Sequence, residues 1–193
     1  MKWLESLALQ VKSLSNILTD DVLNEQINSM TMALKTVKGI TYLTGIGKNM
    51  YTAARVSDTF QSLGIRSLFV DAINTLHGGM GIFSKEDALI SISKSGETEE
   101  LLRLIVLLKE RNFENIFAVT SNGKSRLRNL SKTAIVIPIE SEGDHLGLAP
   151  ISSTMVYGAV LDSIAVQISS ERNFSRSDFV FNHPGGALGR LRV

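Results

Sequence analysis

The 193-residue chain contains no cysteine, which excludes a disulfide framework and any metal site built on thiolates. It also lacks a charge imbalance, because 20 basic and 19 acidic residues give a formal net charge of +1. A chain with this balance offers no broad basic surface, so we expect neither nucleic acid nor a membrane as a partner. The absence of cysteine is consistent with the reducing cytoplasm, where we expect the protein to reside.

No segment of the sequence is long and apolar enough to be expected to cross a membrane. The longest uncharged apolar run, Leu146–Leu161, contains Pro150 and Gly158 and is shorter than the roughly 20 residues that a spanning helix needs. Near the amino terminus, Glu5 and Lys12 interrupt any apolar core, so we expect no signal peptide there.

The remaining pattern predicts alternating strands and helices. Amphipathic helices are expected within residues 3–36. Apolar, β-branched segments predict strands at 39–44, 67–70, 88–93, 115–120 and 134–139. This succession indicates an α/β fold with an open parallel sheet of about five strands and helices on both faces, a flavodoxin-like or Rossmann-like sandwich. We expect one domain over 1–193, with leading helices in 1–38 and the α/β core and carboxyl-terminal tail in 39–193.

Gly- and Ser-rich turns follow three of the expected strands, after Thr44, Ser93 and Thr120. Ligands of open α/β sheets bind beyond the carboxyl ends of the strands, so we expect these turns to share one crevice. The middle turn leads into an expected helix over 97–111, whose free N–H groups and positive dipole end favour an anion. Each such contact contributes only about 0.3–1 kcal/mol when exposed, so a phosphate site would need the hydroxyl groups as well.

The turn Gly45-Ile46-Gly47-Lys48 lies after the first expected strand but does not complete a nucleotide-binding motif. Tyr51 and Thr52 follow where the G-x-G-x-x-G fingerprint would continue, and the Walker spacing is absent. This disfavours NAD and ATP, and we expect no cofactor. Lys48 would lie in the first turn of a helix, where a cation opposes the dipole unless it faces an anionic ligand. Lys48 and Lys94 are therefore each either ligand-binding or solvated.

Carboxylate and imidazole side chains are the candidates for acid–base chemistry. Glu97 at a helix start is also explained by the dipole, whereas Glu140 and Glu142 precede a Gly-rich turn where either could supply a base. The histidines lie beside glycine or proline in turns, without the spacing of a metal site, and are His77, His145 and His183. We expect no metal.

A helix expected over 152–170 is apolar on nearly every face, which is typical of a core element or an oligomer contact. Ser152, Ser153 and Thr154 begin this helix. They would serve either as helix caps or as further phosphate donors.

Five short motifs together resemble the SIS (sugar isomerase) domain family, a phosphosugar-binding α/β fold, over essentially the whole chain. They are GIGKN (45–49), LHGG (76–79), SKSGETEE (93–100), LGLAPISST (146–154) and HPGGALGR (183–190). The last two make the chain most similar to the arabinose 5-phosphate isomerases. The resemblance implies that D-ribulose 5-phosphate and D-arabinose 5-phosphate are interconverted through a cis-enediol, without a cofactor, for the synthesis of Kdo in lipopolysaccharide or capsule.

The resemblance also implies roles for individual residues. Those at the phosphate or against the substrate would be Gly47, Ser93, Ser95, Gly96, Thr98, Ser152, Ser153 and Thr154. Those at the sugar would be Lys48, Glu97, Glu142 and His183, with His77 beside them. We expect Glu142 to be the base, His183 to open the ring or move a proton between oxygens, and Lys48 to stabilise the enediolate. Exchanging the roles of Glu97 and Glu142 fits the sequence equally well.

Some features depart from the family pattern. Full-length relatives carry two CBS domains after the GGALGR segment, and we expect this chain to lack them and their regulation. Lys94 lies at a position where relatives vary, and Asp144 and His145 place extra polar groups beside the expected catalytic turn; either feature could alter substrate choice.

The resemblance implies a homotetramer in which a neighbouring subunit completes each site and a histidine acts in trans. Two alternatives stay open: an isomerase of another phosphosugar, such as a hexulose or heptose phosphate, and a non-catalytic phosphosugar sensor. The sensor is disfavoured because no basic recognition helix is visible.

Overall fold

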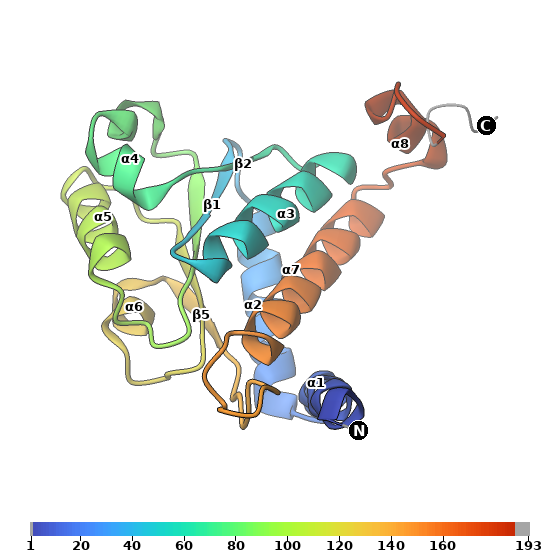
Figure 1. Cartoon of the computed structure of the whole chain (residues 1–193). Coiled ribbons are helices and arrows are strands. Elements are labelled where there is room, and N and C mark those ends of the chain that lie inside the picture. The colour runs from blue at the N-terminus through green and yellow to red at the C-terminus, as the bar shows by residue number, and fades with distance from the viewer. Residues whose placement is uncertain (1, 188–193) are drawn as a thin grey trace.

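The computed structural model describes residues 2–187 and confirms the α/β fold with one parallel sheet (Figure 1). Leu188, Gly189 and Arg190, which end the HPGGALGR motif, lie outside the described residues. The strands are β1 (Thr41–Gly45), β2 (Ser67–Phe69), β3 (Ala88–Ile92), β4 (Ile116–Thr120) and β5 (Thr133–Val136), in the spatial order β2-β1-β3-β4-β5. The strand order reverses direction between β1 and β3, which is the point where open α/β sheets bind ligands.

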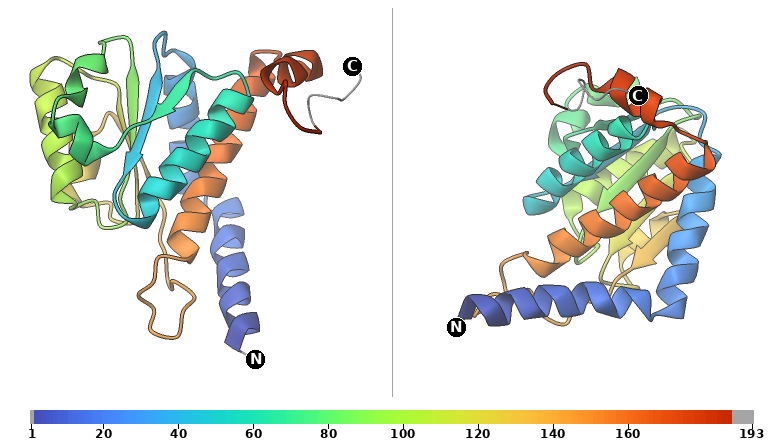
Figure 2. Two further views of the ribbon diagram at one scale, coloured as in Figure 1. Left: turned by 45° about the horizontal axis from the view of Figure 1, so that its top comes forward. Right: turned by 90° about the vertical axis from the view of Figure 1, so that its right-hand side faces the viewer.

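Helices cover both faces of the sheet (Figure 1). One face carries α2 (Asp21–Lys35), α3 (Lys48–Ser62) and α7 (Ser152–Glu171). The other carries α4 (Ala72–Leu76), the 3-10 helix η1 (Gly79–Ile82), α5 (Glu99–Glu110) and α6 (Arg126–Leu130). The flanking helices are α1 (Lys2–Leu18), beside the amino end of α7, and α8 (Arg176–Asn182), after its carboxyl end (Figure 2).

Alternate residues along the strands face two separate apolar cores, as the two-residue period of a strand requires. Ile90 and Phe117 pack into the core shared with α2, α3 and α7, whereas Leu89 and Ile116 pack into the core shared with α5 and α6. β1, β3 and β4 are buried at every position, which explains why their sequences are continuously apolar or small rather than alternating.

The leading segment divides into two helices at Asp20. The Asp20 side chain accepts a hydrogen bond from the Leu23 backbone N–H at 3.0 Å and so caps α2. In α1, Ile17 is buried, but much of the helix is exposed and apolar, including Trp3, Leu4, Leu7, Val11 and Leu18.

No helix within the described range 2–187 is long and apolar enough to span a membrane.

Substitutions within α5 test which of its faces stabilises the fold. Leu104 is 0% exposed, whereas Val106 is 42% exposed on the same helix. Leu104→Ala should lower the free energy of unfolding by about 2–5 kcal/mol because it leaves a cavity against the sheet. Val106→Ala should change it by less than about 0.5 kcal/mol. Urea denaturation measures both, and equal losses would contradict this packing.

Candidate active site

Three strand-end turns meet around one cleft, as the sequence predicts. The cleft has a volume of about 460 Å³, which is in the range of a small-ligand site. It is lined by Asn49 from the start of α3, by residues after β3 and by residues after β4, namely Ser93, Lys94, Ser95, Thr98, Ser121 and Asn122. The cleft lies where the strand order reverses between β1 and β3, and it extends to the neighbouring end of β4.

Hydroxyl groups hold the turn from Ser93 to Thr98 in shape. The Ser93 and Thr98 hydroxyl oxygens lie 2.8 Å apart, and the Gly96 N–H donates to Ser93 Oγ at 3.1 Å. Gly96 has a φ of +66°, and a Cβ added there would lie 2.2 Å from Ser125 Oγ. Only glycine therefore fits, because the turn lies directly against the start of α6.

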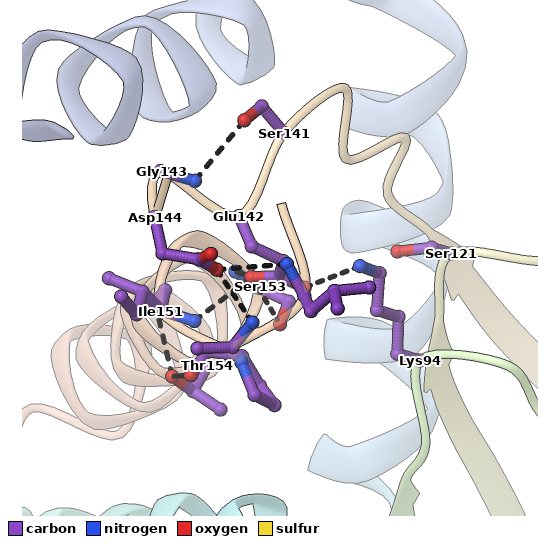
Figure 3. Close-up of polar contacts among 12 residues, drawn as sticks. Lys94, Ser121, Ser141, Glu142, Gly143, Asp144, Ile151, Ser153 and Thr154 are labelled. Atoms are coloured by element: carbon purple, nitrogen blue, oxygen red, sulfur yellow. Dashed lines mark hydrogen bonds and ion pairs between the residues drawn. The ribbon is translucent and has the colours of Figure 1, made fainter. Parts of the chain in front are cut away.

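The backbone of Lys94 is fixed while its side chain reaches across the cleft. Its carbonyl oxygen accepts hydrogen bonds from Ser121 N–H at 3.0 Å and from Thr120 Oγ1 at 3.1 Å. Its ammonium group donates to Glu142 Oε1 at 2.5 Å (Figure 3). Lys94 thus joins the turn after β3 to the loop that precedes α7.

The Glu142 carboxylate is buried, and both of its oxygens accept hydrogen bonds. Its side chain is 1% exposed, and Oε2 accepts from Ile151 N–H at 2.9 Å, Ser153 N–H at 3.0 Å and Ser153 Oγ at 3.1 Å (Figure 3). These contacts satisfy free N–H groups at the amino end of α7. The expectation that a serine or threonine side chain caps this helix is wrong, because Ile151 occupies the N-cap position and Glu142 supplies the acceptor.

Opposing effects set the charge of Glu142. Burial raises the pKa of its carboxyl group. Hydrogen bonds from Lys94 and from the Ser153 backbone and hydroxyl together lower this pKa by more than burial raises it, so that it lies below its ordinary value of 4.5. Glu142 is therefore ionised at neutral pH.

Glu97 has a different environment. The expectation that it lies in the first turn of a helix is wrong, since α5 begins at Glu99 with Thr98 as its N-cap. The Glu97 carboxylate instead accepts from the Arg126 backbone N–H at 2.8 Å and from Arg126 Nε at 2.6 Å. The Arg126 hydrogen bonds lower the pKa of Glu97. Glu97 does not line the cleft of the described chain.

Comparison with known proteins defines the family. Residues 36–167 match the SIS domain. The chain belongs to the SIS domain family. Arabinose 5-phosphate isomerase KpsF of Escherichia coli O6:H1 is 35% identical over 187 residues, which cover 96% of this chain and 56% of that protein. Arabinose 5-phosphate isomerase KdsD of Francisella tularensis is 37% identical over 151 residues, which cover 78% of this chain and 46% of that protein.

Among solved structures, the c3406 protein of E. coli CFT073, in complex with arabinose 5-phosphate, superposes with a TM-score of 0.88. It is 32% identical, and the match covers 93% of this chain and 94% of that one. The present SIS domain spans about half the length of the curated relatives that it matches.

Of three further expected site residues of this SIS domain, Ser95 lines the cleft, whereas Lys48 and Ser152 do not. Lys48 is exposed at the start of α3, after Gly47, whose φ is +62°, and before the cleft residue Asn49. Ser152 Oγ is buried without a hydrogen-bond partner among the described residues. Ser95 Oγ accepts from the Glu97 N–H at 3.1 Å.

None of the three histidines lines this cleft in the described part of the chain. His77 is exposed at the carboxyl end of α4. His183 ends α8, where its Nδ1 lies 2.7 Å from the Phe179 carbonyl oxygen and its ring stacks on Phe179. The adjacent Asn182 shares a surface pocket with Ser62 at the carboxyl end of α3, roughly 20 Å along that helix from Lys48. His183 is thus remote from the cleft of its own chain.

Sequence reasoning did not assign four polar residues that the SIS domain places at or beside the cleft. Asn49, Ser121 and Asn122 follow strand ends in turns that the sequence identified, so their place in those turns could have predicted that they line the cleft. Tyr157 lies inside the apolar helix α7, and its hydroxyl lies 2.5 Å from Ser121 Oγ. Burial raises the pKa of Tyr157 to about 12, so this hydroxyl is neutral.

Acid unfolding tests the ion pair of Glu142. A carboxyl group with a lowered pKa in the folded state stabilises the fold above its ordinary value of 4.5, and this contribution is lost as the pH falls through the folded pKa. Between pH 6 and pH 3, the unfolding free energy of the wild type should therefore fall more than that of Glu142→Gln. At pH 7 the variant should be less stable by about 0.5–2 kcal/mol, the range for a lost helix cap.

Denaturant titrations across this pH range provide the measurement. Glu97, Asp144 and Asp178 also have lowered pKa values, so part of the acid sensitivity should persist in the variant. Identical pH dependence in the two proteins would contradict the assignment.

Proposed function

We propose that this SIS domain is an aldose–ketose isomerase that interconverts D-ribulose 5-phosphate and D-arabinose 5-phosphate and supplies Kdo biosynthesis. The observation that carries the proposal is a hydroxyl-rich turn and a buried, ionised carboxylate joined across one cleft by Lys94. The names of the relatives and the sugar bound to the c3406 protein support the choice of substrate. We place the protein in the cytoplasm.

The phosphate is assigned to the turn after β3 and the amino end of α5. This location supplies hydroxyl groups and free helix N–H groups, and α5 adds its positive dipole end. The residues proposed to lie at the phosphate or against the rest of the substrate are Gly47, Ser93, Ser95, Gly96, Thr98, Ser152, Ser153 and Thr154. The sugar would then extend from this turn toward Glu142.

Glu142 is the proposed base. It would take the C2 proton of arabinose 5-phosphate and return a proton to C1, so that the aldehyde becomes an alcohol and C2 becomes a ketone, with no external oxidant or cofactor. Lys48 would stabilise the negative charge of the enediolate oxygen. Glu97 is a weaker candidate because both of its oxygens accept hydrogen bonds from Arg126 outside the cleft lining.

We propose a homotetramer in which His183 acts in the site of a neighbouring subunit, and in which His77 lies beside the residues at the sugar. α8 follows the carboxyl end of α7 (Figure 1), whereas Glu142 bonds to the amino end of α7. This separation supports the proposal, because it leaves His183 remote from the cleft of its own chain. The exposed apolar side chains of α1 provide a surface for assembly, and they include Trp3, Leu7 and Val11. His183 would move the proton between O1 and O2 or open the sugar ring. In this assembly, residues 1–193 act as one SIS domain.

Turnover of D-arabinose 5-phosphate tests the proposed reaction. Glu142→Gln should lower kcat by about 10²–10⁴-fold, because a positioned base contributes that much. Glu140→Gln, two residues away on the same loop and paired with the exposed Lys12, is the matched control and should retain the wild-type rate. Ribulose 5-phosphate formation provides the measurement.

Three outcomes would contradict the proposal. Glu142→Gln at the full rate would remove Glu142 as the base. Preference for a hexulose or heptose phosphate in a substrate panel would indicate a different isomerase. Saturable binding of phosphosugars without turnover of any would indicate a sensor.

Mixed oligomers test whether His183 acts in a neighbouring site. His183→Ala and Glu142→Gln subunits, each expected to have a strongly lowered kcat alone, are coexpressed with different tags and purified through both tags. The hybrids should regain part of the wild-type kcat, because some sites then combine an intact Glu142 with an intact His183 from another subunit. Hybrids no more active than the separate variants would show that both residues serve the same chain.

A further inference from the structure

We propose that Lys94 is a positioning residue that couples phosphate binding to the base: its ammonium group covers Glu142 Oε1 in the empty site, and a bound phosphate draws it away. This inference rests on the proposed function of Glu142. It assigns a role to a side chain for which the sequence left the choice between ligand binding and solvation open.

The two oxygens of Glu142 have different partners. Oε2 accepts three hydrogen bonds from the amino end of α7, at 2.9, 3.0 and 3.1 Å, and is therefore held in place. Oε1 accepts from Lys94 at 2.5 Å. Oε1 is consequently the atom that can take a substrate proton, and it can do so only after the ammonium group has left it.

Lys94 is also placed to contact a phosphate. It lies between Ser93 and Ser95 in the turn that lines the cleft, and its own side chain lines the same cleft. The bonds of its carbonyl oxygen to Thr120 and Ser121 fix the backbone, so the side chain can move without displacing the turn. A lysine is suited to this movement because its charge sits on a flexible stem, and 42% of this side chain is exposed.

A phosphate dianion at the turn would compete with the carboxylate for the same cation. It carries the greater negative charge, and the carboxylate keeps the three donors on Oε2 when the ammonium group leaves. The base would then be uncovered only when a phosphosugar occupies the cleft, which would favour substrates that carry the phosphate.

The other ionisable groups near Glu142 leave Lys94 as its bonded cation among residues 2–187. Tyr157 on α7 stays neutral, since burial raises its pKa to about 12. Asp144 on the same loop accepts from backbone N–H groups that follow it. Lys12 on α1 pairs with a different residue of the loop.

Carboxyl ¹³C NMR of the full chain tests the coupling without requiring turnover. The Glu142 signal is assigned by its loss in Glu142→Gln and titrated with pH, with and without inorganic phosphate. Without phosphate, Lys94→Gln should raise the pKa of Glu142 by about one pH unit, because it removes an adjacent opposite charge. Phosphate should raise that pKa in the wild type by more than in Lys94→Gln, and Lys94→Arg should restore the larger response.

Kinetic profiles provide a second readout. The acid limb of kcat/KM reports the free enzyme and that of kcat reports the complex, so in the wild type the limb should lie at higher pH for kcat. In Lys94→Gln the two limbs should approach each other and KM for the phosphosugar should rise. Lys85→Gln, an exposed lysine at the amino end of β3, is the matched control and should behave as the wild type.

The outcomes separate the two proposals. An equal response of Glu142 to phosphate in the wild type and Lys94→Gln would overturn the coupling, even if the protein isomerises arabinose 5-phosphate. A larger response in the wild type, in a protein that turns over no phosphosugar, would support the coupling and overturn the proposed function.

Discussion

The buried carboxylate of Glu142 is the contact on which the site depends. Removing a carboxylate from water is unfavourable. Removing one partner of a buried ion pair therefore lowers the stability of the fold more than removing one partner of an exposed pair. Here four hydrogen bonds compensate the charge: three from the amino end of α7 and one from Lys94. The same carboxylate therefore caps the start of α7 and, through Lys94, connects that helix to the turn after β3. Glu142 thus determines both the shape of the cleft and the charge within it.

Stability and basicity place opposite requirements on the Glu142 carboxylate. The donors that stabilise the ionised carboxylate also lower its pKa, which weakens it as a base. A substrate whose phosphate displaces Lys94 would remove the strongest of these donors at the moment when basicity is needed. Stability of the empty protein and reactivity of the occupied one would then be served by the same side chain in two positions.

The sheet could be predicted from the sequence because its signals are local. The buried strands β1, β3 and β4 are short apolar runs that end in Gly- and Ser-rich turns, and the rule that parallel strands bind ligands at their carboxyl ends placed those turns together. Helix starts were less predictable. Glu97 resembles a first-turn acid, but Arg126, 29 positions away, decides its environment. Ser152 resembles a cap, but Glu142 from the preceding loop supplies the acceptor at the start of α7.

The site itself could be predicted only in part, for the same reason. Ser93, Ser95 and Thr98 were identifiable from the chemistry of their turn, whereas the contact of Lys94 with Glu142 joins residues 48 positions apart and needs the fold. The separation of His183 from the cleft likewise follows from the direction of α7, which no local pattern encodes, although the sequence predicted the length of that helix.

Proton NMR of D-arabinose 5-phosphate turnover in deuterated water tests the central claim most directly. An ionised Glu142 that transfers a proton through a cis-enediol predicts ribulose 5-phosphate with deuterium at C1, and deuterium at C2 of the arabinose 5-phosphate that forms in the reverse direction. Conversion with no deuterium in either sugar, even after prolonged incubation at equilibrium, would contradict the enediol route, and the absence of conversion would contradict the isomerase.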